Sequence, residues 1–208
     1  MQTEWIKVDE PAAIEHTADV LRNGGLAAFP TDTVYGLGVL LSRLDALERL
    51  YLIKGQNQTR SISILFADPA QAGLFLNVPE EPLNRLAKAF WPGALTIVGA
   101  AKAGVPAGVI HEGMVGVRCP DLPLLSSLLQ LAGPLAVSTA NLPGEPFPVT
   151  AQGVHRQLNG RIHLLLDGGA SPLGAVSTIV EIKPDQAPQV LRQGPVSEEA
   201  VRKARASG

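Results

Sequence analysis

Residues 26–38 read LAAFPTDTVYGLG and contain the most informative pattern in the sequence. The first four residues are apolar and are bounded by a glycine and a proline, as expected for a short buried strand. Two hydroxyls, a carboxylate and two glycines follow, so small polar groups are predicted at a strand's carboxyl end, where open α/β sheets bind ligands. Gly36 and Gly38 would let backbone N–H groups approach an anion. The alternative is a structural turn held by an Asx-type bond from Asp32.

Outward from this stretch, short strands and helices alternate irregularly. Asp9 is expected to cap a helix that runs to Arg22. Ser42 with Asp45 resembles a capping box that opens a second helix with Leu44 inward. Further helices are predicted over residues 82–90, 124–131, 151–158 and 198–205, and strands over residues 61–66, 94–99, 115–118, 135–138, 162–166, 176–182 and 189–192. This mixture predicts an α/β fold: one domain over residues 1–208 (core about 10–196) on a twisted, mixed open sheet.

Composition excludes several classes of protein. The chain has 208 residues, 46% of them apolar, and 17 Lys+Arg against 19 Asp+Glu, which excludes intrinsic disorder and a polybasic nucleic-acid coat. The single cysteine, Cys119, excludes an intramolecular disulfide and a multi-cysteine zinc site, and the four histidines show no metal-ligand spacing. The uncharged stretch 122–144 is interrupted by proline and glycine, so no membrane span is expected. A cytoplasmic protein without a protein-held metal is therefore predicted.

Two segments place cations where an anion could bind. Lys54 opens the polar stretch KGQNQTRS after a predicted helix, which suits a phosphate-binding loop but lacks the Walker spacing; solvated cations are the alternative. Arg118 lies in the apolar strand VGVRCPD, where burying its charge is costly unless it meets an anion. Its partner is predicted to be either an internal carboxylate such as Asp121 or the carboxylate or phosphate of a ligand.

The remaining candidates are again polar groups at strand ends. They are the segment STAN (138–141), DGG (167–169), Ser177 and Arg192. Taken singly, each fits ordinary turn and cap chemistry. Taken together, they suit binding of a polar, anionic small molecule and not hydrolysis through a covalent nucleophile.

The segments also form an ordered set. FPTDTVYGLG, the Lys54 loop, WPGALTIV, VGVRCP, STAN with a proline-rich loop, DGG, VSTIV and LRQGPVS occur in this order between residues 26 and 196. The set resembles the YrdC-like threonylcarbamoyl-AMP synthases. The resemblance implies a nucleotidyltransferase that joins L-threonine, bicarbonate and ATP into threonylcarbamoyl-AMP and releases pyrophosphate. It also implies a concave cleft, a role in the threonylcarbamoyladenosine (t6A) modification of tRNA, and tRNA, double-stranded RNA or a tRNA-modifying transferase complex as partners.

The resemblance assigns roles by position in the matching motifs. ATP would arrive as its magnesium complex. This expectation rests on the affinity of its phosphates for Mg²⁺ and not on a cluster of metal ligands in the sequence. Threonine-binding roles fall on Thr33, Arg118, Thr139 and Ser177. ATP-binding roles fall on Lys54, Gln56, Arg60, Asn141 and Arg192, with Lys54 and Arg60 expected to be catalytic.

The chain departs from the family pattern in the Lys54 loop. Gln56 stands where the family has arginine, Asn57 where proline is usual, and Leu65 where histidine is common. Loss of a phosphate-facing cation costs about 1.5–3 kcal/mol. The hypothesis is that Arg60, four residues along the loop, reaches into the vacated place.

Two other functions compete with synthesis. The altered loop favours a catalytically divergent member that binds nucleotide or double-stranded RNA; Lys102, Arg118, Arg156 and Arg161 could edge one groove, although scattered cations are usually solvated surface. Carbamoyl chemistry of hydrogenase maturation occurs in much longer proteins with zinc modules, and the single cysteine argues against it.

Overall fold

The computed structural model describes residues 2–55 and 62–206. Its ten strands form one sheet in the order β1-β8-β2-β3-β7-β4-β6-β5-β9-β10, with both parallel and antiparallel neighbours. This confirms the predicted α/β fold with a mixed open sheet. The strands are β1 (Glu4–Lys7), β2 (Ala27–Phe29), β3 (Gly36–Leu40), β4 (Ser63–Leu65), β5 (Leu95–Ala100), β6 (Met114–Arg118), β7 (Leu135–Thr139), β8 (Leu164–Asp167), β9 (Thr178–Glu181) and β10 (Gln189–Arg192).

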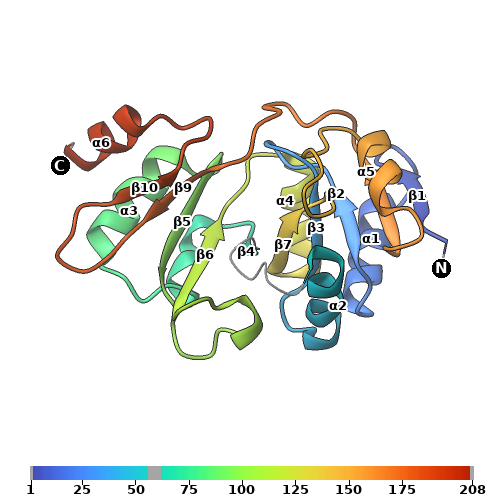
Figure 1. The fold of residues 1–208 in the computed structure, drawn as a ribbon, viewed down its shortest axis with the longest axis horizontal. Coiled ribbons are helices and arrows are strands. Elements are labelled where there is room, and N and C mark those ends of the chain that lie inside the picture. Colours follow the sequence, from blue (N-terminus) through green and yellow to red (C-terminus); the bar gives the residue numbers. More distant parts are fainter. Residues whose placement is uncertain (1, 56–61, 207–208) are drawn as a thin grey trace.

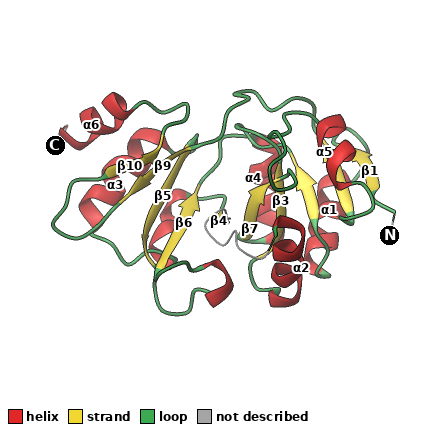
Figure 2. Cartoon of the chain, in the orientation of Figure 1, coloured by secondary structure: helices red, strands yellow, loops and turns green. Residues whose placement is uncertain are grey.

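The helices lie on both sides of this sheet. In Figure 1, α3 and α6 lie at the end of the molecule that carries β9 and β10, whereas α1 and α5 lie beside β1 at the other end. Figure 2 shows loops gathering above the central strands. The helices are α1 (Ala13–Arg22), α2 (Leu44–Lys54), η2 (Pro69–Leu74), α3 (Glu80–Phe90), η3 (Ala107–Val109), α4 (Pro123–Ala132), α5 (Ala151–Leu158) and α6 (Glu198–Ala206).

The sheet separates two apolar cores by the alternation of its side chains. In β2, Ala27 and Phe29 pack with residues of α1 and α4, while Ala28 between them packs with residues of α2. In β8, Leu165 likewise packs in the core that contains α2, whereas Leu164 and Leu166 pack in the core that contains α1 and α4. Both strands are buried on both faces, which explains why each reads as a continuous apolar run instead of an alternating one.

The predicted start of the first helix was wrong. Helix α1 begins at Ala13, and its N-cap residue Ala12 has a left-handed backbone (φ 58°) and provides no side-chain cap. Instead of Asp9 capping a helix, Glu10 closes a turn, because its carboxylate accepts the backbone N–H of Lys7 at 2.7 Å. That turn ends β1, a strand that the sequence pattern did not predict and that pairs with β8.

The predicted capping box of the second helix was also wrong. The N-cap residue of α2 is Arg43, and no side chain caps it. The Asp45 carboxylate pairs with the guanidinium groups of Arg43 and Arg49 instead of reaching back to Ser42. Leu44 points to solvent, with 56% of its surface exposed, and not into the core.

Gly36 and Gly38 do not form an anion-binding loop. They lie in β3, which pairs with β2 on one side and β7 on the other, so their backbone groups belong to the sheet. A β-carbon on Gly36 would lie 2.8 Å from a methyl of Val137, and one on Gly38 would lie 2.8 Å from the ring of Phe29. These glycines make room for core side chains.

Candidate functional site

One cavity of about 470 Å³ lies along the strand ends in the middle of the molecule. Thr139 and Arg118 end β7 and β6, Ser177 precedes β9, and Arg192 ends β10, so four strands contribute polar groups to one space. The structure thus brings together every described residue to which the resemblance assigns a role, whereas Asp32, Gly38 and residues 167–169 do not line the cavity. Those that line the cavity are Thr33, Lys54, Arg118, Thr139, Asn141, Ser177 and Arg192.

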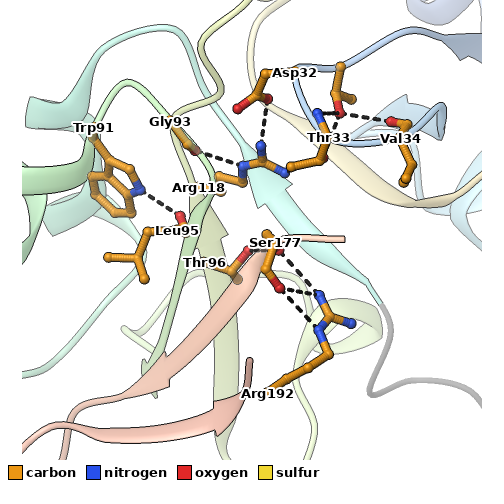
Figure 3. A network of polar contacts seen from close by, with 11 residues as sticks. Asp32, Thr33, Val34, Trp91, Gly93, Leu95, Thr96, Arg118, Ser177 and Arg192 are labelled. Atoms are coloured by element: carbon orange, nitrogen blue, oxygen red, sulfur yellow. Dashed lines mark hydrogen bonds and ion pairs between the residues drawn. The ribbon is translucent and has the colours of Figure 1, made fainter. Parts of the chain in front are cut away.

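Arg118 forms the centre of one end of the cavity. Its guanidinium donates to the Asp32 carboxylate, to the Thr33 hydroxyl at 2.9 Å and to the Gly93 carbonyl at 2.9 Å (Figure 3). Burial lowers the pKa of Arg118, and the negative charge of Asp32 opposes that shift. The group therefore stays charged, and these three bonds use three of its five N–H donors.

The internal partner of Arg118 is Asp32, 86 residues away in the chain, and not Asp121. Asp121 is exposed to solvent. Asp32 also does not form the Asx-type turn considered above, since its Oδ1 accepts from Arg118 and its Oδ2 is buried without a hydrogen-bond partner among the described residues.

Ser177 and Arg192 form the opposite wall. The Arg192 guanidinium donates to the Ser177 carbonyl at 2.9 and 3.1 Å and to its hydroxyl at 3.2 Å (Figure 3). The Ser177 hydroxyl also shares a 2.8 Å hydrogen bond with the hydroxyl of Thr96 in β5. Burial lowers the pKa of Arg192, and the positive charge of Arg118 lowers it further. Two cations therefore face one cavity, which favours an anionic ligand.

Lys54, the last residue of α2, lies beneath the third wall. Its ammonium donates to the Thr139 carbonyl at 2.9 Å, the Asn141 carbonyl at 2.7 Å and the Asn141 side-chain oxygen at 3.0 Å. Only 2% of Lys54 is exposed. Burial lowers its pKa to about 8.

The sequence interpretation did not single out several residues of the cavity. Thr96 occupies a buried position of the apolar strand LTIVGA, where a hydroxyl among apolar neighbours is the available signal. Tyr35, whose hydroxyl donates to the Gly169 carbonyl at 2.7 Å, and Phe147, which is half exposed, also line the cavity. Tyr35 belongs to the candidate segment 29–38, although no role was assigned to it, whereas a loop phenylalanine such as Phe147 carries no sequence signal.

Other sequence predictions have different outcomes. Gln56 and Arg60 lie outside the described residues. Within residues 2–55 and 62–206, no group of three or more His, Cys, Asp or Glu side chains could hold a metal ion. No helix in the described part of the chain is long and apolar enough to cross a membrane.

The four cations proposed to edge a groove for RNA do not form one surface. Arg118 is buried within the cavity. Lys102 follows β5 and Arg156 lies on α5; in Figure 1, β5 lies left of the centre and α5 lies near the right end. The positions of Lys102, Arg118 and Arg156 therefore fit the alternative of scattered cations better than a single groove.

Comparisons with known proteins agree with this geometry. The family Sua5_yciO_yrdC, described as "Telomere recombination", matches residues 19–194. The chain is 35% identical to a threonylcarbamoyl-AMP synthase of Bacillus subtilis over 96% of its own length and 58% of that protein's. It is 33% identical to a threonylcarbamoyl-AMP synthase of Vibrio cholerae over 87% of its own length and 97% of that protein's.

The solved structures include one with a ligand. The structure of P. abyssi Sua5 complexed with L-threonine is 32% identical to the chain and superposes with a TM-score of 0.88, covering 98% of the chain and 61% of the P. abyssi protein. The chain thus spans a little more than half the length of the Bacillus and P. abyssi proteins.

Proposed function

The chain belongs to the Sua5/YciO/YrdC family, and we propose that it is an L-threonylcarbamoyladenylate synthase, a nucleotidyltransferase that makes threonylcarbamoyl-AMP and pyrophosphate from L-threonine, bicarbonate and ATP. The observation that carries the proposal is that two arginines line one cavity from opposite walls, the buried Arg118 and the solvent-exposed Arg192. The reaction requires this kind of site, since a carboxylate and a triphosphate must be held close together.

We assign the threonine to the Arg118 end of the cavity. Arg118 retains two N–H donors after its three contacts with described residues, which suits a carboxylate bound by two hydrogen bonds. The hydroxyls of Thr33, Thr139 and Ser177 supply further polar contacts within the same space. The complex of the related P. abyssi protein with L-threonine supports threonine as a ligand, and the placement at Arg118 rests on the contacts above.

We assign ATP to the wall formed by Lys54, Asn141 and Arg192, with Gln56 and Arg60 completing it. The magnesium ion would enter as part of the substrate, held by the phosphates. In the reaction the threonine amine and bicarbonate form a carbamate and water. A carbamate oxygen then attacks the α-phosphorus of ATP, and the bond to pyrophosphate breaks. No protein nucleophile takes part, so the protein contributes positioning, charge stabilisation and exclusion of water.

The proposal includes the biological setting. The product would be consumed in the t6A modification of tRNA by a transferase complex in the cytoplasm, where ATP and tRNA are present. A second function, binding of nucleotide or double-stranded RNA without synthesis, is favoured by Gln56, which replaces a cation of the family motif.

The test is pyrophosphate release from ATP by purified protein with bicarbonate and magnesium, with and without L-threonine. Synthesis predicts threonine-dependent release and an adenylate detectable by mass spectrometry. Arg118→Ala should abolish that release, whereas Arg202→Ala, an exposed arginine on α6, should not. Measurable ATP binding without threonine-dependent release, beside an active relative, would establish the binding function in its place.

The role of Arg60 has its own test. If Arg60 replaces the missing arginine, Arg60→Ala abolishes ATP binding while Gln56→Ala barely changes it. The reverse result would contradict the hypothesis that Arg60 takes over the role of the arginine that the family has at position 56.

A further inference from the structure

The ammonium group of Lys54 lies beneath the cavity wall, facing the end of β7. We define the Asn141 turn as residues 139–145, which leave β7 and enter the proline-rich loop. Lys54 comes from α2, and its side chain is buried with its nitrogen against this turn. The residues that it contacts are 85 and 87 positions further along the chain. It therefore ties a helix end to the turn that forms one wall of the cavity.

The hydrogen-bonding capacity of Lys54 is fully used by this turn. A lysine ammonium has three N–H donors and no acceptor. Three oxygens lie at 2.7 to 3.0 Å from Nζ: the carbonyls of Thr139 and Asn141 and the side-chain oxygen of Asn141. Each is at ordinary hydrogen-bond length, so no donor is left over. A phosphate oxygen would have to displace one of these three acceptors before it could bind Lys54.

The side chain of Asn141 is saturated in the same way. Its oxygen accepts from Lys54 and from the Thr139 hydroxyl at 2.6 Å. Its two N–H groups donate to the carbonyls of Leu142 at 3.1 Å and Glu145 at 2.8 Å. An amide offers two donors and two acceptor sites, and all four are engaged. Lys54 and Asn141 together therefore close the Asn141 turn into one hydrogen-bonded unit.

We propose, resting on the proposed function, that Lys54 is a positioning residue that holds the Asn141 turn in shape for the nucleotide and makes no direct contact with its phosphates. Glu145, Gly144 and Pro143 of this turn line the cavity, so its backbone shape decides what fits there. The charge of the ammonium matters because all of its partners are oxygens, including the more distant Thr139 hydroxyl at 3.5 Å. Arg192, on the opposite wall, is then the described cation available to the phosphates.

A positioning lysine and a phosphate-binding lysine differ in one measurable respect. If Lys54 bound the β- or γ-phosphate, its loss would weaken ATP much more than AMP, which lacks both groups. If Lys54 shapes the turn, its loss weakens both nucleotides by a similar factor. The decrease of nucleotide affinity with rising salt concentration should also be similar for wild type and variant, because the substitution removes no contact with a phosphate.

The experiment is calorimetric titration of ATP and AMP into wild type, Lys54→Met and the matched control Lys102→Met. Lys102 also donates to a carbonyl, that of Gly73 at 2.8 Å, but lies outside the cavity. We expect Lys54→Met to weaken both nucleotides by a similar factor, on the order of tenfold or more, and Lys102→Met to change neither. A loss in Lys54→Met confined to ATP would overturn the proposal.

Hydrogen exchange of the ligand-free protein tests the same inference without nucleotide. Lys54→Met should accelerate exchange of backbone amides in residues 139–147, and Lys102→Met should leave that segment unchanged. Unchanged exchange in Lys54→Met would overturn the proposal. Wild type that binds neither nucleotide would refute the proposed function, yet the exchange result would still decide whether Lys54 holds the turn.

Discussion

Arg118 and Asp32 form an ion pair in the wall of the cavity, between two side chains that are each almost completely buried. The pair has no net charge, but its geometry is unequal: Arg118 keeps unused N–H donors, and one oxygen of Asp32 has no partner among the described residues. The Asp32 carboxylate therefore compensates the arginine while leaving a guanidinium edge for a ligand. The threonine carboxylate would meet an arginine already held in position.

Replacing Asp32 tests this arrangement. Asp32→Asn keeps the shape of the side chain but leaves the buried charge of Arg118 uncompensated, so we expect a loss of about 3–5 kcal/mol in the free energy of unfolding. Urea denaturation measures it. Asp121→Asn, at the exposed position that the sequence had suggested as partner, serves as control and should be nearly neutral. Equal stability of both variants would show that Asp32 does not compensate the buried charge of Arg118.

Arg192 is expected to affect both substrates. It supports Ser177 through three hydrogen bonds, and Ser177 in turn contacts Thr96. Arg192→Ala should lower ATP affinity through the lost charge and also lower threonine affinity several-fold, because Ser177 loses its support. Calorimetric titration of each substrate measures the two effects. Ser177→Ala is the comparison variant, in which only threonine affinity should fall. Unchanged threonine binding in Arg192→Ala would contradict the link.

The pH dependence of nucleotide binding follows from Lys54. Burial lowers its pKa from 10.5 to about 8, and its hydrogen-bond partners are uncharged oxygens of Thr139 and Asn141. Above that pH the amine loses a proton and has two N–H donors for three acceptors. We expect AMP affinity to fall as the pH rises through about 8, a range in which the AMP phosphate, with a pKa near 6, no longer titrates.

The contribution of Lys54 to stability should change in the opposite direction. Between pH 8 and 10.5 the unfolded chain keeps a proton that the folded protein has released. The contribution of Lys54 to the free energy of unfolding therefore increases as the pH rises through that window, since the folded protein no longer buries a charge. Comparison of wild type with Lys54→Met by denaturation isolates this contribution.

The two Lys54 predictions can fail separately. AMP affinity that stays constant as the pH rises through 8 would contradict the expected role of the ammonium in nucleotide binding.

Gly38 is a packing position. Gly38→Ala would place a methyl 2.8 Å from the Phe29 ring, so we expect a loss of about 1–3 kcal/mol in stability. Phe29→Leu in the same chain should recover part of it, and the double-mutant cycle measures the coupling. Gly73→Ala is the control, because its added carbon meets no atom within 4 Å. Additive effects of Gly38→Ala and Phe29→Leu would argue against the contact.

Cys119 should be chemically inert in the folded protein. It is buried, and burial raises the pKa of its thiol to about 11, so little thiolate forms at neutral pH. Iodoacetamide should modify it slowly in buffer and rapidly in urea. Rapid modification of the native protein would show that the thiol is accessible.

Local signals in the sequence predicted most strands and helices within a few residues, because apolar runs and their glycine and proline boundaries depend on near neighbours. The strand at Gln189–Arg192 and the helix at Ala151–Leu158 have the predicted bounds. The errors occurred where a side chain had a competing partner, as when Asp45 paired with Arg43 instead of capping its helix. β1 was missed because Asp9 and Pro11, which follow it, were interpreted as the start of a helix, and because its four residues are stabilised by pairing with β8.

The fold class, the polar character of the strand ends and many of the cavity residues could be predicted from the sequence, although Thr96 and Phe147 were not. The pairing of the polar residues could not be predicted and is seen in the structure: Arg118 pairs with Asp32, Lys54 with Asn141, and Arg192 with Ser177. The physical reason is that a strand's composition is a local property, whereas the partner of a buried charge depends on the order of strands in the sheet. That order places β7 between β3 and β4, and so brings together groups that are more than 80 residues apart in the chain.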